Sequence, residues 1–225
     1  MRLTVVFIVL FVTHFVMSAQ NSLEKNVGTF DEVKVYDLIE VNLVKSNENK
    51  VVISGNEADN VEIINKNNKL KIRMKLDKIF KGESTFVTVY YSALKTIDGN
   101  EGSLIISNET IDQDYIELKA QEGARLKINA NVNKLNIRAV SGGIVEVSGK
   151  GNAQDIVLNT GGIYQGQNFE TQTTNVTISA AGEANVFATN TVNAKVRAGG
   201  DVNIYGQPKN INETTTLGGR IKRME

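Results

Sequence analysis

Residues 135–148 read LNIRAVSGGIVEVS, and this stretch determines how the rest of the chain is interpreted. On each side of the pair Gly142-Gly143 lies a short run in which apolar and polar residues alternate. Period-two alternation that is rich in Val and Ile is typical of strands and not of helices. The stretch therefore predicts a strand, a tight glycine turn and a second strand.

Pairs of small residues recur at an even spacing through the C-terminal half of the chain. They are Gly123-Ala124, Gly142-Gly143, Gly161-Gly162, Ala181-Gly182, Gly199-Gly200 and Gly218-Gly219. Counted from the first residue of each pair, the spacings are 19, 19, 20, 18 and 19 residues. Self-similarity at a fixed period of this size is the signature of a repeat architecture.

The apolar positions keep the same register from one repeat to the next. Before the turns they are Ile116/Leu118, Leu135/Ile137, Ile156/Leu158, Val176/Ile178 and Ala194/Val196; after them they are Leu126/Ile128, Val145/Val147, Ala184/Val186 and Val202/Ile204. A unit of about 19 residues cannot bury its own apolar side, whereas stacked units form a continuous dry interior. We therefore predict an all-β protein, a β-solenoid or irregular single-sheet β-helix with coils of about 19 residues.

Clusters of Asn, Gln and Thr mark the expected return turns between coils. They include Asn131-Val132-Asn133, Asn152-Ala153-Gln154, and residues 171–175, 190–193 and 210–212. Side-chain amides at equivalent positions of successive coils can form hydrogen-bonded ladders. Metal binding is the alternative use of such turns, but the nonapeptide pattern that binds calcium in glycine- and aspartate-rich repeats does not occur here.

The N-terminal segment has the features of a secretory signal peptide. Arg2 is followed by an apolar run from Leu3 to Met17, and Ser18-Ala19 offers a small-residue cleavage site. A membrane anchor is the alternative, although the run is shorter than the roughly 20 residues that a spanning helix needs. We expect a signal peptide at 1–19, a flexible leader at 20–29, and one solenoid domain at 30–223 with no membrane span after cleavage.

Within that domain, residues 30–106 carry less regular coils and residues 107–223 the regular glycine-turn coils. Alternating runs in the first part include Leu70/Ile72/Met74/Leu76 and Leu104/Ile106. Residues 78–84 break the spacing and predict a loop or insertion.

Composition excludes several kinds of chemistry. The chain has no Cys, and its one His, His14, lies in the expected signal peptide. Imidazole acid–base catalysis, Cys nucleophiles and thiolate or imidazole metal sites are therefore ruled out for the processed chain. Lys and Arg total 25, as do Asp and Glu, so no net field favours nucleic acid. We expect no cofactor, no metal site and no nucleic-acid partner.

The chain resembles the head GIN domain family, described as a putative auto-transporter adhesin and typical of exported proteins of Bacteroidetes-type bacteria. The resemblance rests on residues 30–36, 41–44 and 51–55 near the beginning, and on residues 199–209 and 217–222 near the end. It spans about residues 29–223. The resemblance implies a solenoid fold and an adhesion-like role, and it implies no catalytic residues.

Two surfaces are candidates for ligand contact. Lys69, Lys71, Arg73 and Lys75 alternate with apolar residues, which predicts four cations on one strand face that could bind an anionic ligand such as an acidic glycan. The alternative is a solvated face whose charges prevent edge-to-edge aggregation. Tyr164 and Tyr205 are candidates for outward side chains that could form a small contact patch, and packing against the turns is the alternative, favoured use of each.

We expect an exported, non-enzymatic protein of the periplasm, outer-membrane surface or extracellular space. It would act as an adhesion-like interaction module whose envelope or surface partner is unknown, a glycan being one candidate. One alternative is a structural scaffold that assembles with itself, so a homo-oligomer is left open. The other is a polysaccharide-cleaving β-helix enzyme that works with carboxylates such as Asp155, Asp201, Glu146 or Glu183.

Overall fold

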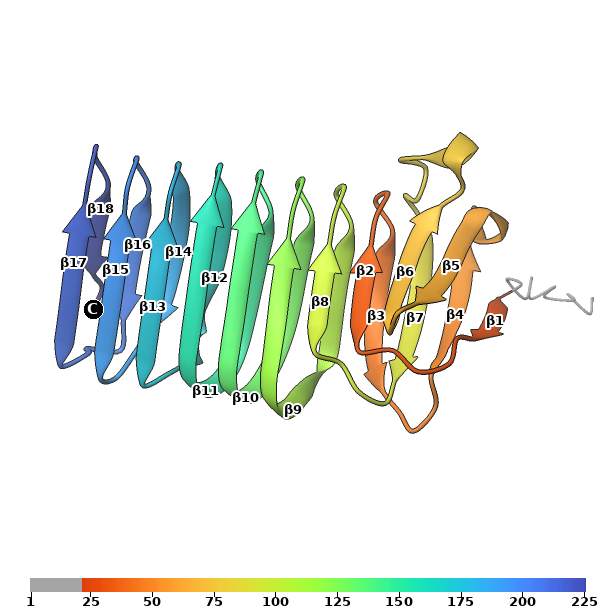
Figure 1. The fold of residues 1–225 in the computed structure, drawn as a ribbon, viewed down its shortest axis with the longest axis horizontal. Coiled ribbons are helices and arrows are strands. Elements are labelled where there is room, and N and C mark those ends of the chain that lie inside the picture. The colour runs from red at the N-terminus through yellow and green to blue at the C-terminus, as the bar shows by residue number, and fades with distance from the viewer. Residues whose placement is uncertain (1–21) are drawn as a thin grey trace, which may run out of the picture.

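Short alternating runs form strands throughout residues 22–225, the part of the chain that the computed structural model describes. The strands stack into an elongated column of coils with the turns aligned along one long edge (Figure 1). The predicted all-β solenoid is therefore confirmed. The expected signal peptide lies outside the described residues.

The column has two faces, one made of strands that lead into the glycine turns and one made of strands that leave them. The N-terminal strands are β1 (Leu23–Asn26), β2 (Glu32–Val35), β3 (Glu40–Lys45), β4 (Lys50–Gly55), β5 (Val61–Lys66), β6 (Lys69–Met74), β7 (Thr85–Tyr91) and β8 (Thr96–Gly99). Three long strands follow: β9 (Leu104–Ala120), β10 (Arg125–Val140) and β11 (Ile144–Asn159). The C-terminal strands are β12 (Gly162–Glu170), β13 (Thr173–Ile178), β14 (Gly182–Phe187), β15 (Thr191–Val196), β16 (Asp201–Tyr205), β17 (Asn210–Thr215) and β18 (Arg220–Arg223).

The pairing register reproduces the sequence repeat from β9 to the C-terminus. All of these neighbours are parallel: Arg125 lies opposite Ile144, Thr177 opposite Lys195, and Asp201 opposite Arg220. Every predicted inward position from residue 116 to residue 204 is buried. The even spacing of the glycine turns thus corresponds to one residue of each coil lying directly beside its counterpart in the next.

In the turn pair Gly142-Gly143, glycine is favoured at each position for a different physical reason. Gly142 has a φ of 74°, in the left-handed region that favours glycine. A Cβ on Gly143 would collide with the carbonyl oxygen of Ala120 in the preceding coil. The amide nitrogen of Gly142 also donates to the carbonyl oxygen of Thr160 in the next coil, at 3.1 Å. The doublet therefore both closes the turn and lets neighbouring turns touch.

In the middle coils, continuous strands take the place of the return turns that the sequence predicts. Strands β9, β10 and β11 run continuously through residues 110–114, 129–133 and 148–152, which bend while keeping parallel pairing. Only one shift interrupts the pairing of β9 with β10, between Ile128 and Asn129. From β9 onward, separate return turns occur only after β12, where the chain leaves the strand before the next coil starts.

The N-terminal coils do not follow chain order. Strand β2 lies between β6 and β8, and β3 lies between β7 and β9 (Figure 1). Strands β4 and β5 turn back antiparallel against β7 and β6, and β1 pairs antiparallel with β4. Part of the expected flexible leader is therefore a strand, because residues 23–26 pair with β4.

One alternating pair of the N-terminal region, Leu104/Ile106, and the last residue of another run, Leu76, do not take the inward positions expected of them. Ile105 is buried between Val41 and Leu126, so Leu104 and Ile106 are only partly buried. Leu76 leaves the alternation altogether because it starts a short 3-10 helix, Leu76–Lys78, and is 73% exposed. A second 3-10 helix covers Ala58–Asn60.

We predict that Val147→Asp strongly destabilises the protein. Val147 is 1% exposed in the interior, so the substitution buries an unpaired carboxylate at a cost of about 3 kcal/mol or more. Thermal unfolding followed by circular dichroism should show a midpoint lower by about 10 °C. Ser148→Asp, one residue further and exposed, is the matched control and should leave the midpoint almost unchanged. A Val147→Asp midpoint within a degree or two of the wild-type value would contradict the register.

Candidate binding surfaces

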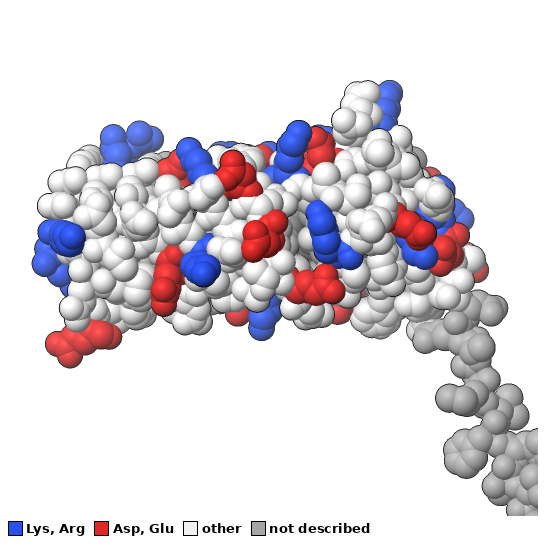
Figure 2. Space-filling model, turned by 90° about the horizontal axis from the view of Figure 1, so that it is seen from below, with Lys and Arg blue, Asp and Glu red and all other residues white. Residues whose placement is uncertain are grey.

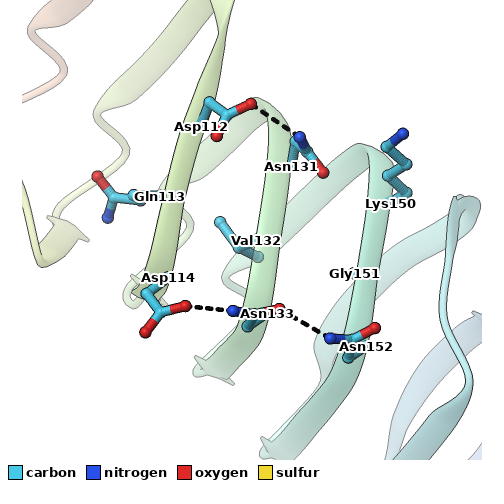
Figure 3. A pocket seen from close by; sticks show the side chains of 9 residues that line it. All are labelled: Asp112, Gln113, Asp114, Asn131, Val132, Asn133, Lys150, Gly151 and Asn152. Carbon is cyan, nitrogen blue, oxygen red and sulfur yellow. Dashed lines mark hydrogen bonds between the residues drawn. The ribbon is translucent and has the colours of Figure 1, made fainter.

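The bends of β9, β10 and β11 form an open polar groove on the edge opposite the glycine turns (Figure 3). Its volume is about 500 Å³. Its outward side chains come from three successive coils and are Asp112, Asp114, Asn131, Asn133, Lys150 and Asn152. The interior side chains Ile111, Ala130 and Val132 alternate with them and are buried, which fixes the polar side chains outward.

Hydrogen bonds across the coils orient these side chains (Figure 3). The Asn131 amide donates to Asp112 Oδ2 at 2.8 Å, and the Asn133 amide donates to the Asp114 carboxylate. The Asn152 amide in turn donates to Asn133 Oδ1 at 2.7 Å. Amide ladders, which the sequence predicts, are therefore present, and here they run toward a carboxylate that can only accept.

A second ladder of the same kind lies on the face that leads into the turns. Asn212 donates to Asn193, Asn193 to Asn175, and Asn175 to Asp155, each at 2.7 Å. Lys134 also approaches Asp155, at 2.9 Å. Burial acts to raise the pKa of Asp155, but the hydrogen bonds from Asn175 and Lys134 outweigh it and hold the pKa below its ordinary value.

The groove provides carboxylate and amide oxygens, amide N–H groups and the Lys150 ammonium within one short stretch of surface. Lys150 is exposed and has no ion-pair partner among the described residues. Tyr115, 37% exposed, lies beside the groove on β9, and its hydroxyl accepts a hydrogen bond from Asn136 at 3.1 Å. This donor and acceptor set suits a ligand with many hydroxyl groups.

Sequence reasoning did not identify Asp112 and Asp114 as site residues. The repeat itself contained the signal, because residues 112, 131 and 150, like 114, 133 and 152, are separated by 19. At two of these positions the first coil has Asp where the next has Asn.

The four cations of the expected face lie along β6 and directly after it, but each contacts an acidic, aromatic or carbonyl group of the protein. Lys69 Nζ lies 2.9 Å from Glu32, and Arg73 Nη2 lies 2.8 Å from Glu62. The Lys71 ammonium lies over the Tyr36 ring, 5.7 Å from its centroid. Lys75 comes after the end of β6, and its ammonium donates to the Asp59 carbonyl oxygen at 2.8 Å. Anion binding by these four residues stays a prediction.

The carboxylates considered for sugar cleavage are held by neighbouring side chains. The Arg220 guanidinium makes two hydrogen bonds to Asp201, both at 2.6 Å, and holds its pKa below the ordinary value. Glu146 lies 3.6 Å from Lys127, and Glu183 accepts a hydrogen bond from Asn185 at 3.2 Å. A glycosidase acid needs a raised pKa, whereas Asp155 and Asp201 have lowered ones.

The expectation that Tyr164 points outward is wrong. Tyr164 lies opposite Val145 and Ala184 in the inward register and is fully buried. Its hydroxyl donates to Gln154 Oε1 at 2.6 Å, and burial raises its pKa. A Cβ on Gly166, at the next inward position, would collide with the ring of Tyr164. The small residue makes room for the large one, so Tyr164 is a core residue.

Tyr205 is half-buried on the outer side of β16, as expected.

Across residues 22–225, no group of three or more Asp, Glu, His or Cys side chains could hold a metal ion. Over the same residues, no helix is long and apolar enough to cross a membrane. Acidic and basic side chains are interspersed along the underside of the column, the edge that bears the groove (Figure 2).

We predict that the Asp155 ladder makes stability depend on pH. A carboxylate whose pKa is lowered by folding stabilises the fold above its unfolded pKa of about 4, and this contribution disappears as pH falls through the folded pKa. Asp155→Asn should therefore lower the thermal midpoint by a few degrees at most at pH 7 and leave it unchanged near pH 2. Lys134→Gln should give a smaller loss at pH 7. A difference that grows toward low pH would contradict this assignment.

Comparison with known proteins supports the fold and identifies the family. The family model described as "Putative auto-transporter adhesin, head GIN domain" matches residues 29–208. No curated protein matches the chain. Among solved structures, a putative adhesin from Bacteroides fragilis has a TM-score of 0.84 at 16% identity, covering 92% of this chain and 98% of its own.

Two further crystal structures have the same fold at lower similarity. A putative lipid binding protein from Parabacteroides distasonis has a TM-score of 0.68 at 16% identity, and covers 93% of this chain and 98% of its own. A putative adhesin from Parabacteroides merdae has a TM-score of 0.63 at 15% identity, with the same two coverages. At these identities the likeness establishes the solenoid alone. The match of the family model over most of the chain shows that this protein belongs to the head GIN domain family.

Proposed function

We propose that this protein is an exported, non-enzymatic interaction module of the cell envelope that binds glycans in an adhesion-like role. The observation that carries the proposal is the groove of about 500 Å³ whose carboxylate, amide and ammonium groups come from three successive coils. Membership of a family described as adhesins supports the general role. The ion pairs Lys134–Asp155 and Arg220–Asp201, which occupy two of the carboxylates considered for cleavage, support a binding function.

The groove would bind sugar hydroxyls by hydrogen bonding and not by burial of apolar surface. Carboxylates such as Asp112 accept from hydroxyl groups, while Lys150 donates and favours acidic sugars. Because Asn131 and Asn133 are already oriented by the ladder, little side-chain entropy would be lost on binding. An extended chain of sugars could lie across the coils, where equivalent positions repeat.

The end of the column supports a module rather than a self-assembling scaffold. In the last described coil, Ile211 and Ile221 continue the inward register, but the positions that follow Ala194 and Ile204 are Glu213 and Arg223, which are exposed. Polar residues at inward positions of a terminal repeat oppose further stacking. Light scattering over a concentration series should give a constant monomer mass, whereas a mass that rises with concentration would favour the scaffold.

We predict that the chain from Gln20 onward binds immobilised envelope polysaccharides or mucin-type glycans. Asp112→Asn/Lys150→Gln should weaken this binding at least about tenfold, because two charged hydrogen-bonding groups are replaced by neutral amides. Asp201→Asn/Lys222→Gln, with the same change of charge at the far end of the column, is the matched control and should bind like wild type.

Two results would contradict the proposal. One is the absence of wild-type binding to every glycan tested. The other is equal binding by the groove variant and its control. Release of new reducing ends from a polysaccharide would instead favour the cleaving enzyme.

A further inference from the structure

The loop between β6 and β7 exposes large apolar side chains. Leu76 is 73%, Phe80 57% and Ile79 43% exposed. They lie in a segment, residues 75–84, that rises above the row of turns at the N-terminal end of the column (Figure 1). We call this segment the apolar loop. Leu23, Ile64 and Leu217 are exposed singly elsewhere, whereas here three large apolar side chains are exposed within five residues, and such a cluster requires a reason.

Lysines accompany the apolar side chains in a regular pattern. The Lys78 amide donates to the Lys75 carbonyl oxygen at 2.8 Å, and the Lys81 amide donates to the Lys78 carbonyl oxygen at 3.1 Å. Only Leu76–Lys78 is helical, so the three lysines are placed by their own contacts. Lys75 donates to the Asp59 carbonyl oxygen at 2.8 Å and Lys78 lies 4.0 Å from Glu57, whereas Lys81 is exposed and has no ion-pair partner among residues 22–225. The three lysines outnumber the two acids of the loop, Asp77 and Glu83.

The loop is fixed at its base and does not depend on contacts of its tip. The Asp37 carboxylate, in a residue only 3% exposed, accepts from the Met74 amide at 2.9 Å and from the Phe80 amide at 3.1 Å. The Gly82 amide donates to the Asp37 carbonyl oxygen at 3.1 Å, and a Cβ at Gly82 would collide with that oxygen. Phe80 has a φ of 60°, which is rare for a bulky residue. The fold thus maintains a strained backbone that presents Phe80 outward.

We propose that the apolar loop inserts into the interface of an anionic lipid membrane. Leu76, Ile79 and Phe80 would enter the boundary between headgroups and acyl chains, while the lysines of the loop, the exposed Lys81 first among them, would contact lipid phosphates. A protruding tip suits a flat lipid surface, whereas a protein partner would need a matching concavity. The groove lies on the opposite edge of the column, so it would face away from the membrane. The inference does not depend on what the groove binds.

The test uses the chain from Gln20 onward, because the apolar segment at residues 3–17 would itself bind lipid, and the shortened chain contains every strand of the described fold. Flotation is measured with vesicles of equal parts phosphatidylglycerol and phosphatidylethanolamine, and with phosphatidylcholine alone. Wild type should float with the anionic vesicles. Leu76→Ser/Ile79→Ser/Phe80→Ser should bind at least about tenfold more weakly. Lys78→Gln/Lys81→Gln should lose roughly fivefold per lysine on anionic vesicles only.

Controls separate insertion from other effects. Ile64→Ser/Val157→Ser removes two exposed apolar side chains from strands and should float like wild type. Because the chain has no cysteine, an environment-sensitive dye on Ile79→Cys should shift to the blue on vesicles, and a dye on Lys150→Cys at the groove should not. Circular dichroism confirms that each variant is folded.

Three results would overturn the proposal. The first is wild-type protein that stays with neither vesicle type, and the second is a triple variant that floats like wild type. The third is a wild-type dimer in lipid-free solution that the triple variant abolishes, since the apolar loop would then contact a second copy.

Discussion

The parallel register between successive coils is the constraint on which the structure depends. From β9 onward each paired residue lies beside a residue 18 to 21 positions further along the chain, as Arg125 lies beside Ile144 and Asn175 beside Asn193. A slip of one residue would turn every inward aliphatic side chain outward. The glycine turns keep that register because Gly143 touches the backbone of the preceding coil and admits no side chain.

The same register determines the outer surface. Because outward positions also stack, one Asn or Asp per coil becomes a ladder, and several ladders beside a bend become a groove. The two ends of the column do not follow this repeat. At the N-terminal end, antiparallel strands and the apolar loop replace regular coils; at the C-terminal end, Glu213 and Arg223 occupy inward positions. Surface features that are not periodic therefore lie where the stacking is interrupted.

The regular coils could be predicted from the sequence because their turns, strands and core share one period. Val147 and Ile178 were correctly placed by alternation alone. Tyr164 was not, because alternation does not show that Gly166 leaves space for an inward ring. The position of β2 between β6 and β8 depends on long-range pairing, which local patterns do not encode. Asp112 and Asp114 form part of a groove only because the strands bend there without breaking.

A disulfide scan tests the stacking most directly, since the chain contains no cysteine. Thr177 and Lys195 are direct neighbours on the outer side of β13 and β15, at a spacing compatible with a disulfide. Thr177→Cys/Lys195→Cys should form an intramolecular disulfide on mild oxidation, detected as a loss of two hydrogens by mass spectrometry, with the strand content unchanged. Thr177→Cys/Arg197→Cys, displaced by one position on the same face, should stay reduced. Cross-linking of the displaced pair but not of the direct pair would contradict the coil register.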